Sequence, residues 1–362
     1  MGEAIEPKVR RCGPPDRGAQ ADLFNRCFKK SVQAADLVWR YDTNPHGSSA
    51  SFLTDVEGRG VSGYACSPRI VIPGGEVASG APVGETGDVM TDPEWRKRGL
   101  FSALDRACME ETARLGWPCV FGLPNRRSAH IFLTLGWEQI GTVRPWTFVL
   151  RADAGARELR TREGRLAGFL TGRGARRGRK ARAELVQRGA GHSSEPLTSF
   201  PDEVDGLTAE VASRFAWMVR RDAAYLTWRF LQSPSGLHRA LGVRDASGSF
   251  AGYAVVQLPR PGEVQGYLVD VLARDDAALA ATIEAGLAAL ESAGASVVQA
   301  TAIDGSWWRG ELERAGFLPP KPENHLIVIL YTHDAEHPVS RAARDASAWY
   351  FTDGDRDDET MG

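Results

Sequence analysis

The chain has 362 residues, of which 43% are hydrophobic and 25% are charged. This length allows two domains of ordinary size, and the composition is that of a globular protein in water. The formal net charge is −2, so overall charge gives no reason to expect a nucleic acid or a membrane surface as a partner. No apolar run approaches the ~20 residues that a membrane-spanning helix needs.

The N-terminus and the cysteines favour a cytoplasmic location. The first residues, Met-Gly-Glu-Ala-Ile-Glu, lack the basic and then apolar pattern of a secretion signal. The five cysteines are scattered, odd in number and without a C-x-x-C pair. This pattern indicates reduced thiols rather than disulfides.

Apolar periodicity and turn residues predict alternating strands and helices in the first 150 residues. The predicted elements are, in order, a strand entered at Val9 and Arg10, a helix over 20–30, strands at 51–54 and 61–72, a helix over 102–115, a strand at 119–123, a helix over 125–135 that Gly136 closes, and a strand at 140–150.

A strand, a basic turn and a helix follow one another directly between Glu85 and Leu104. Asp92-Pro93 is a turn signal, because proline biases the preceding residue away from helix. Arg96-Lys97-Arg98-Gly99 then opens an amphipathic helix. A helix N-terminus offers free backbone N–H groups and positive dipole charge, and a glycine there lets a ligand approach closely. The segment therefore predicts an anion site suited to a phosphate or pyrophosphate.

The same segment resembles the acyl-CoA loop of the GNAT superfamily of N-acyltransferases. Their signature, Gln/Arg-x-x-Gly-x-Gly/Ala, is matched here by Arg96-x-x-Gly99-x-Phe101, with Phe in place of the last small residue. A second GNAT pattern, Asn-x-x-Ala-x-x-x-Tyr-x-x-x-Gly-Phe, is matched in spacing by Asn125, Ser128, Phe132, Gly136 and Trp137. The resemblance covers residues 7–150 well and the rest more faintly.

The resemblance implies acetyl-CoA or a longer acyl-CoA as co-substrate, and no metal. The backbone of Val89, Met90 and Thr91 would pair with pantetheine, and amides from Arg98 to Ser102 would hold the pyrophosphate. Asn125 would touch pantetheine, cap a helix, or do both. The expected cofactor-binding residues are Val89, Met90, Thr91, Arg96, Lys97, Arg98, Gly99, Leu100, Phe101, Ser102, Asn125, Ser128 and Phe132.

Transfer to an amine needs a group that accepts the ammonium proton and one that protonates the leaving thiolate. The resemblance places the base at Glu85, with Asp88 near it, although either could be an ordinary loop acid. The family's usual acid is the Tyr that Phe132 replaces, and Phe cannot donate a proton. The remaining candidates for the acid are Tyr64, Tyr41 and His130, or solvent; His46 is a candidate for contact with the acceptor.

Residues 151–205 are rich in glycine and arginine and sparse in apolar side chains. We expect a solvated linker or crossover here, and a basic patch for CoA phosphates or a polyanion is the alternative. The basic residues packed among its glycines are Arg173, Arg176, Arg177, Arg179, Lys180 and Arg182.

The second half of the chain repeats short patterns of the first, which predicts a tandem duplication. The matched pairs are 37–41 with 226–230, 63–65 with 252–254, and 135–137 with 315–317. The Trp-Arg dipeptide kept in the first pair is interpreted as a packing feature. The second copy has no Arg-x-x-Gly loop, and Asp275 and Asp276 stand where a pyrophosphate would be repelled. We therefore expect only the first copy to bind the cofactor.

Together these patterns predict an α/β (α+β) protein with two tandem GNAT-like domains, each a mixed, mostly antiparallel sheet flanked by helices. The expected segments are an N-terminal domain with the acyl-CoA site at 1–150, a basic linker at 151–205, a degenerate domain at 206–345 and a tail at 346–362. In the tail, aromatic residues 349–351 are expected to anchor the chain and the acidic end to fray.

The implied function is direct transfer of an acyl group from a CoA thioester to a primary amine. A small-molecule acceptor is expected, such as an aminosugar of an antibiotic or other natural product, or of an envelope glycan. Three alternatives remain open: a Fem-like aminoacyl transferase, a non-catalytic CoA-binding scaffold or sensor, and a nucleic-acid binder that uses the basic linker.

Overall fold

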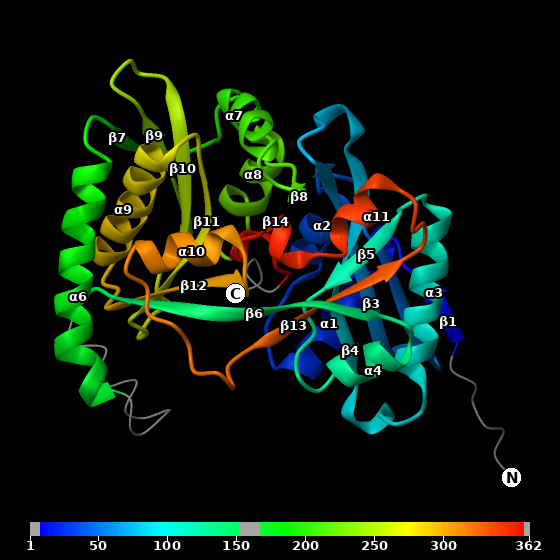
Figure 1. The fold of residues 1–362 in the computed structure, drawn as a ribbon. Coiled ribbons are helices and arrows are strands. Elements are labelled where there is room, and N and C mark those ends of the chain that lie inside the picture. Colours follow the sequence, from blue (N-terminus) through cyan, green and yellow to red (C-terminus); the bar gives the residue numbers. More distant parts are fainter. Residues whose placement is uncertain (1–7, 152–166, 358–362) are drawn as a thin grey trace, which may run out of the picture. The chain divides into compact units, whose positions relative to one another are not determined.

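The computed structural model describes residues 8–151 and 167–357. The chain divides into two compact units, each built from segments distant in sequence (Figure 1). Unit 1 comprises residues 1–72, 79–140 and 328–344, and unit 2 comprises residues 73–78, 141–327 and 345–362. In the described ranges, no helix is both long enough and apolar enough to cross a membrane.

Unit 1 is organised around one mixed sheet, with the strand order β1-β2-β3-β4-β5-β13. Its strands are β1 (Lys8–Arg11), β2 (Ala50–Val56), β3 (Arg59–Pro73), β4 (Ala81–Thr91), β5 (Cys119–Gly122) and β13 (Leu326–Thr332). Neighbouring strands are antiparallel except β4 and β5, which are parallel. This is the mixed, mostly antiparallel sheet predicted from the sequence.

Helices cover both faces of this sheet. They are α1 (Arg17–Phe28), α2 (Ala34–Asp42), α3 (Leu100–Arg114), α4 (Ala129–Thr134) and α11 (Pro338–Ala343), with short turns η1 (Pro14–Asp16) and η3 (Pro93–Trp95). Leu23 of α1 packs against Leu53 of β2 and Met90 of β4. Tyr64 of β3 pairs with Phe52, the residue before Leu53 in β2, and its hydroxyl donates a hydrogen bond to Asp105 of α3. Because side chains alternate along a strand, α1 and α3 lie on opposite faces.

Unit 2 has a second mixed sheet, with the order β6-β12-β11-β10-β9-β7. Its strands are β6 (Glu138–Val149), β7 (Ser193–Leu197), β9 (His238–Arg244), β10 (Phe250–Gln257), β11 (Gln265–Ala273) and β12 (Val297–Ile303). Only β11 and β12 are parallel neighbours in this order. A separate parallel pair joins β8 (Trp217–Val219) to β14 (Trp349–Tyr350).

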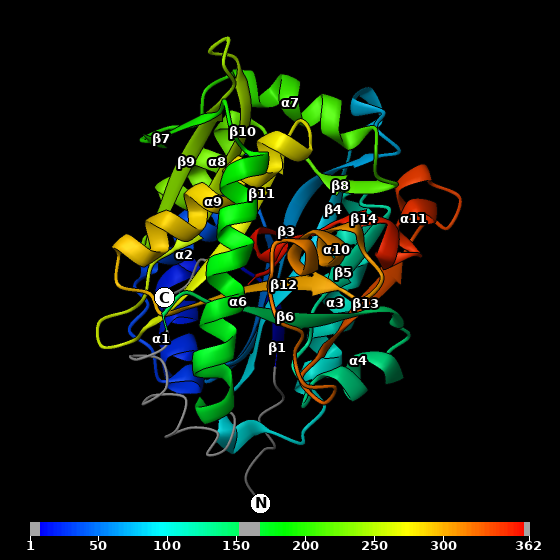
Figure 2. The same ribbon diagram turned by 60° about the vertical axis from the view of Figure 1, so that its left-hand side comes forward.

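The helices of unit 2 also occupy two faces. They are α6 (Ala167–Arg188), α7 (Glu203–Ala212), α8 (Ala223–Leu226), α9 (Asp276–Ser292) and α10 (Trp307–Arg314), with short turns η2 (Val77–Ser79), η4 (Thr227–Leu231), η5 (Ala346–Ala348) and η6 (Asp353–Asp355). Helices α6 and α9 lie side by side over the apolar face that contains Val256, Leu268 and Val298 (Figure 2).

The last strand predicted for the first domain belongs to the other unit's sheet. After α4 the chain supplies β6, which pairs with β12 of unit 2. After α10 the chain supplies β13, which pairs with β5 of unit 1. The pattern over 140–150 predicted a strand correctly but assigned it to the wrong domain, because alternation specifies which face is buried and not which sheet edge the strand joins.

The expected linker at 151–205 contains a structured part of unit 2. Helix α6 buries Ala181 and Leu185, and Arg182 pairs with Glu284 and Glu291 of α9. A Cβ on Gly178 would lie 2.4 Å from the Val149 carbonyl oxygen. The low apolar content therefore reflects close packing through small residues, and the linker interpretation was wrong for this helix. The side chain of Arg173 lies outside the described residues.

The matched pairs of the sequence repeat do not all occupy equivalent positions in the two units. Gly136 and Gly316 both end a helix with φ near +92° and +93°, as a C-terminal cap requires. The pair 63–65 and 252–254 is not equivalent. Tyr64 points to α3, whereas Tyr253 bonds to Asp270 on the face opposite α9. A shift of one residue reverses the faces of a strand, so this match was out of register.

Candidate functional site

The parallel strands at the centre of unit 1 separate after a short pairing. Gly84, Glu85 and Thr86 of β4 pair with Val120, Phe121 and Gly122 of β5, where β5 ends. A Cβ on Gly122 would lie 2.3 Å from Thr86 Cγ2, so this close approach requires glycine. Strand β4 continues to Thr91. Its backbone over 87–91 therefore extends past the end of its parallel partner.

A β-bulge lies in β4 where the two strands separate. Gly63 of β3 pairs with Met90 and Ala65 pairs with Gly87, so β4 holds one extra residue between them. Asp88 lies in this bulge with φ of 49°, an uncommon conformation for a residue with a side chain. A bulge bends and twists its strand, which turns β4 away from β5. The expected pantetheine residues Val89, Met90 and Thr91 begin at this bulge.

The basic turn leads into an uncapped helix N-terminus, as predicted. Gly99 has φ of 75° and immediately precedes α3, and Ala103 N donates to Gly99 O. The amides of Leu100, Phe101 and Ser102 come before this first helical bond, so the helix's own carbonyls do not use them. Glycine has no side chain that could cap them. The arginine and lysine side chains of 96–98 are all exposed.

Contacts from within unit 1 fix the turn. Asp92 is buried and accepts hydrogen bonds from Arg59 at 2.8 Å, Arg26 at 3.3 Å and the Glu94 amide at 3.3 Å. Burial raises the pKa of Asp92, but these hydrogen bonds and charges outweigh it and hold the pKa below its usual range. The guanidinium of Arg98 lies 4.4 Å from the ring centre of Trp95. The loop is therefore shaped by contacts with its own unit.

Phe101, the departure from the family signature, points into an aromatic cluster. Its ring lies 5.0 Å from that of Phe132, which lies 5.0 Å from that of Trp137. Tyr64 meets both phenylalanine rings edge-on, at 6.2 and 6.4 Å. The bulky side chain thus joins α3 to α4 while its amide stays at the helix start. Phe132 is 2% exposed and serves as core in this arrangement.

Asn125 forms a turn that precedes α4. Its Oδ1 accepts from the amides of Arg127 at 2.9 Å and Ser128 at 3.1 Å, and the residue is exposed. Helix α4 begins at Ala129, four residues later than predicted. An asparagine side chain that bonds to the backbone two and three residues on favours such a turn over a helix. Ser128 is the residue just before the helix.

The two candidate bases lie in different settings. Glu85 is fully buried in an ion pair with Arg69, with side chains 1% and 2% exposed. Asp88 pairs with Arg40 of α2 at 2.8 Å and accepts a hydrogen bond from the Tyr41 hydroxyl. Asp88 lies in the bulge itself, whereas Glu85 precedes the point where the strands separate. Asp88 therefore lies closer than Glu85 to the point along β4 where the pairing with β5 has ended.

Tyr64 is joined to a buried carboxyl group that sequence reasoning missed. Its hydroxyl donates to Asp105 at 2.8 Å, and Trp137 Nε1 donates to the same oxygen at 3.2 Å. Burial raises the pKa of Asp105 to about 6 against these two hydrogen bonds. Burial also raises the pKa of Tyr64. The detectable signal was a carboxylate on the apolar stripe of a helix, between Leu104 and Cys108.

Asp105 also lines a groove of about 490 Å³ on unit 1. The groove runs between α3 and the ends of α4 and β13, with Arg106 and Glu110 on one side and Tyr331 on the other. Both acidic and basic side chains line the groove, so its charge favours neither an anionic nor a cationic ligand.

The histidine candidates are not brought together with these groups. His130 is exposed on α4. His46 is buried, and its Nδ1 accepts a hydrogen bond from the Ile70 amide at 3.1 Å. Across 8–151 and 167–357, no group of three or more His, Cys, Asp or Glu side chains is placed to hold a metal ion.

In unit 2 the chain itself enters the gap between the corresponding strands. Pairing of β11 with β12 ends at Tyr267 and Gln299. The tail then contacts both strands through η6: Asp353 accepts the Thr301 amide of β12 at 2.6 Å, and a Cβ on Gly354 would lie 3.0 Å from Asp270 Cβ of β11. One backbone group at this gap, the amide of Thr301, is therefore already bonded to the tail.

Buried ion pairs hold this part of the tail. Arg221 pairs with Asp355 at 2.7 Å and with Asp270 at 3.2 Å. Asp353 and Asp355 are each 2% exposed, so the prediction of a frayed acidic end was wrong for them, because buried arginine and amide partners compensate their charge. The aromatic anchor was predicted correctly, since residues 349–351 are all buried. Residues 358–362 lie outside the described part of the chain.

The helix that follows β11 is capped by its own carboxylate. Asp275 accepts hydrogen bonds from the amides of Ala277 at 3.0 Å and Ala278 at 2.8 Å at the start of α9. These are the N–H groups that a phosphate would need. The structure thus gives Asp275 a capping role in addition to the repulsion predicted from its charge.

Comparisons with known proteins agree with this geometry. Residues 8–140 match a family model described as an acetyltransferase (GNAT) domain. Similar solved structures include a probable N-acyltransferase from Enterococcus faecalis V583 (TM-score 0.61, 14% identity, 92% of this chain and 74% of that chain). Another is a tandem GNAT protein from the clavulanic acid biosynthesis pathway (TM-score 0.56, 15% identity, 90% and 98% coverage).

A third similar structure is a GCN5-related N-acetyltransferase from Kribbella flavida (TM-score 0.58, 15% identity, 92% of this chain and 73% of that chain). At these identities the likeness shows a shared fold. No curated protein matches the chain.

Proposed function

We propose that the chain transfers an acyl group from a CoA thioester to a primary amine of a small molecule. The match of residues 8–140 to the model of an acetyltransferase (GNAT) domain supports this proposal. The observation that carries this proposal is the combination of two features in unit 1. Strand β4 carries a bulge just after its pairing with β5 ends, and the turn that follows β4 leads to the uncapped N-terminus of α3.

The cofactor would bind along this path. Its pyrophosphate would accept hydrogen bonds from the amides of Leu100, Phe101 and Ser102, with charge supplied by the basic residues 96–98. Its pantetheine would extend along the backbone of 89–91, as an added strand does. Asn125 lies exposed at the turn before α4, where its side chain already holds the backbone. Acetyl-CoA and a longer acyl-CoA both remain candidates for the co-substrate.

The chemistry we propose is direct attack in a ternary complex. The neutral amine nitrogen attacks the thioester carbonyl carbon, a C–N bond forms, and the C–S bond breaks to release the thiolate. Asp88 would receive the ammonium proton through water and release it to solvent, and its ion pair with Arg40 would hold the carboxylate in position. Tyr64 would protonate the thiolate and regain a proton from solvent, while Asp105 accepts a hydrogen bond from its hydroxyl and orients it.

We propose unit 2 as a structural partner that does not bind CoA. Its helix start is capped by Asp275 and its strand gap holds η6. For the acceptor we propose an amine or aminosugar of a natural product. The support for this class is the likeness to the tandem GNAT protein from the clavulanic acid biosynthesis pathway. We propose a cytoplasmic location, because all five cysteines are free thiols and four of them are buried.

The test is amine-dependent release of free CoA thiol. The purified protein would be given acetyl-CoA or a long-chain acyl-CoA together with a panel of aminosugars and simple amines. We expect turnover with at least one pair, and Arg98→Glu to reduce kcat/KM at least tenfold. Arg179→Glu is the matched control, because it makes the same change of charge at an exposed arginine of α6 in unit 2.

Other outcomes would favour the alternatives. Tight CoA binding without turnover for any amine would favour a non-catalytic sensor or scaffold. No binding of any CoA would contradict the proposal and move the assignment to a Fem-like aminoacyl transferase. DNA binding that weakens steeply with salt and is lost when the exposed Arg176, Arg177 and Arg179 are changed to Glu would favour the nucleic-acid alternative.

A further inference from the structure

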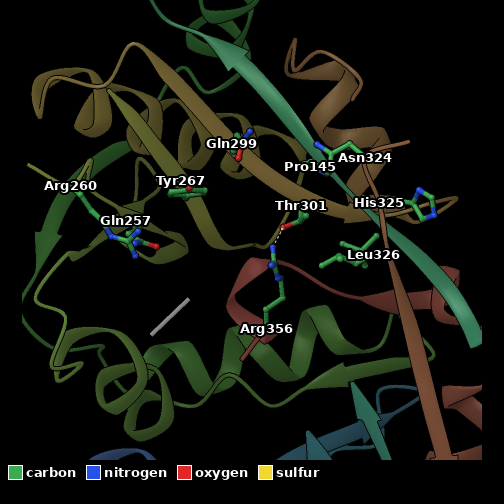
Figure 3. Close-up of a pocket in the computed structure, with 11 residues that line it drawn as sticks. Pro145, Gln257, Arg260, Tyr267, Gln299, Thr301, Asn324, His325, Leu326 and Arg356 are labelled. Atoms are coloured by element: carbon green, nitrogen blue, oxygen red, sulfur yellow. Dashed lines mark hydrogen bonds between the residues drawn. The ribbon is translucent and has the colours of Figure 1, made fainter. Parts of the chain in front are cut away.

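Unit 2 contains a second cavity, of about 440 Å³, that the proposed acyl transfer does not use. Its floor is formed by side chains from neighbouring strands, Gln257 of β10, Tyr267 of β11, and Gln299 and Thr301 of β12. These residues alternate with those of the apolar core under α6 and α9, so they face the opposite side of the sheet. Figure 3 shows them around a common space, which Arg260 and Arg356 also border.

Two arginines, Arg260 and Arg356, give the cavity its positive charge. None of the described residues that line it is an Asp or Glu. Arg260 is exposed at one end of the cavity, beside Gln257 (Figure 3). Arg356 approaches from the tail, and its Nη1 donates to Thr301 at 3.2 Å and to Asp353 at 3.0 Å. One arginine is thus partly neutralised and fixed in position, while the other adds a net positive charge. This arrangement favours an anionic occupant.

A buried amide oxygen in the floor calls for a hydrogen-bond donor. Gln257 is 4% exposed, and its Oε1 has no hydrogen-bond partner among the described residues. Leaving such a buried group without a hydrogen bond is unfavourable. The neighbouring polar groups are held in place, because Gln265 Nε2 donates to Tyr267 at 2.8 Å and to Gln299 at 2.7 Å. A hydroxyl group on a bound molecule would satisfy Gln257.

This cavity is not a second CoA site. The gap between β11 and β12 is filled by η6, and the amides at the start of α9 are bonded to Asp275. The cavity's polar floor also lacks a free helix N-terminus for a pyrophosphate. The occupant must therefore be a compact molecule that brings both its own charge and its own hydroxyl donors.

We propose that this cavity binds a small hydroxylated molecule that carries a carboxylate or a phosphate, such as a sugar acid or a sugar phosphate. Arg260 and Arg356 bind the anionic group, and Gln257 accepts a hydrogen bond from a hydroxyl. The assignment concerns unit 2 alone and does not depend on where, or whether, acyl transfer occurs.

The test is isothermal titration of the full chain with four probes: gluconate, glucose 6-phosphate, glucose and inorganic phosphate. Saturating CoA is present throughout, because a phosphate could otherwise bind at the helix start after Gly99. We expect gluconate, glucose 6-phosphate or both to bind, with glucose and inorganic phosphate at least tenfold weaker. The better of the two anionic sugars identifies whether a carboxylate or a phosphate is the preferred group.

Three variants separate this site from general charge effects. Arg260→Glu should weaken the anionic sugar at least tenfold, whereas Arg179→Glu, on a helix over the other face of the same sheet, should leave it unchanged. Gln257→Leu should weaken the sugar and leave inorganic phosphate unaffected. Equal losses in the two arginine variants, equal binding of sugar phosphate and inorganic phosphate, or no saturable binding of either anionic sugar would overturn the proposal.

Discussion

The two units share a strand plan and differ at the place where one of them would bind CoA. In unit 1 the parallel pair β4–β5 ends at Gly122, and α3 starts after a glycine that leaves its first amides uncapped. In unit 2 the corresponding pair β11–β12 ends at Gln299, η6 contacts both strands, and Asp275 caps α9. The comparison teaches that the fold alone does not make the site. One side chain at a helix start and one inserted turn are sufficient to change its chemistry.

The largest expected effect lies in the ion pairs of the closed gap. Arg221→Ala would leave Asp270 and Asp355 buried without their cation, and breaking such a pair costs about 3–5 kcal/mol. Urea unfolding would measure this loss. Arg40→Ala in unit 1, which removes the partner of one carboxylate only, serves as the comparison and should cost less. Equal losses would show that the tail's ion pairs do not stabilise unit 2 in the way described.

The next largest effect is the change with pH in the stability of unit 1. The pKa of Asp105 is raised to about 6 in the folded protein, so between about pH 4 and 6 the folded state binds more protons than the unfolded state. Stability from this group is therefore greatest at low pH and is lost as pH rises through 6. A rise of about 2 pKa units corresponds to at most about 3 kcal/mol.

Asp105→Asn tests this linkage. The variant keeps an oxygen that accepts from Tyr64 and removes the buried charge, so its unfolding free energy should change less between pH 4.5 and 7.5 than that of the wild type. Urea unfolding at several pH values gives the two profiles. Parallel profiles would show that Asp105 does not titrate in this range.

A smaller effect is expected when α3 of unit 1 is given a capping aspartate like Asp275 of unit 2. Gly99→Asp places a carboxylate beside the amides of Leu100 to Ser102, where it would compete with and repel a pyrophosphate. CoA affinity should fall at least tenfold, which corresponds to about 1.4 kcal/mol. Isothermal titration with CoA measures it, and circular dichroism checks that the fold is kept. Unchanged affinity would place the cofactor elsewhere.

The smallest expected effect is the reverse change. Asp275→Ala removes the cap of α9 and should destabilise unit 2 by about 1 kcal/mol. Because η6 still occupies the strand gap, the variant should gain no CoA site. Thermal unfolding and CoA titration measure the two consequences. A second bound CoA would mean that the cap, and not the tail, closes unit 2.

The sequence predicted the features that depend on neighbouring residues. The turn over 96–99, the helix end at Gly136 and the strands follow from local signals such as glycine position and apolar alternation, and the mixed sheets follow from the family resemblance. The predicted resemblance to GNAT acyltransferases was also confirmed, since residues 8–140 match that domain model. Its two motifs are short and continuous, so they can be recognised without knowledge of the fold. These features need no knowledge of which distant segment packs against them.

What the sequence could not predict depends on pairing over long distances. The exchange of β6 and β13 involves strands whose alternation is compatible with either sheet. The burial of Asp355 depends on Arg221, more than 130 residues earlier in the chain, and that of Asp353 depends on the amide of Thr301. Asp105 was overlooked because a carboxylate on an apolar stripe becomes informative only when its partner Tyr64 is known.

The measurement that tests the central claim most directly is the stoichiometry of CoA binding by native mass spectrometry. The intact protein would be measured with acetyl-CoA and with a long-chain acyl-CoA, alongside the Gly99→Glu and Asp275→Ala variants. We predict one CoA per chain in the wild type and in Asp275→Ala, and none in Gly99→Glu. Two CoA molecules per chain, or one that persists in Gly99→Glu, would contradict the assignment of the cofactor site to unit 1.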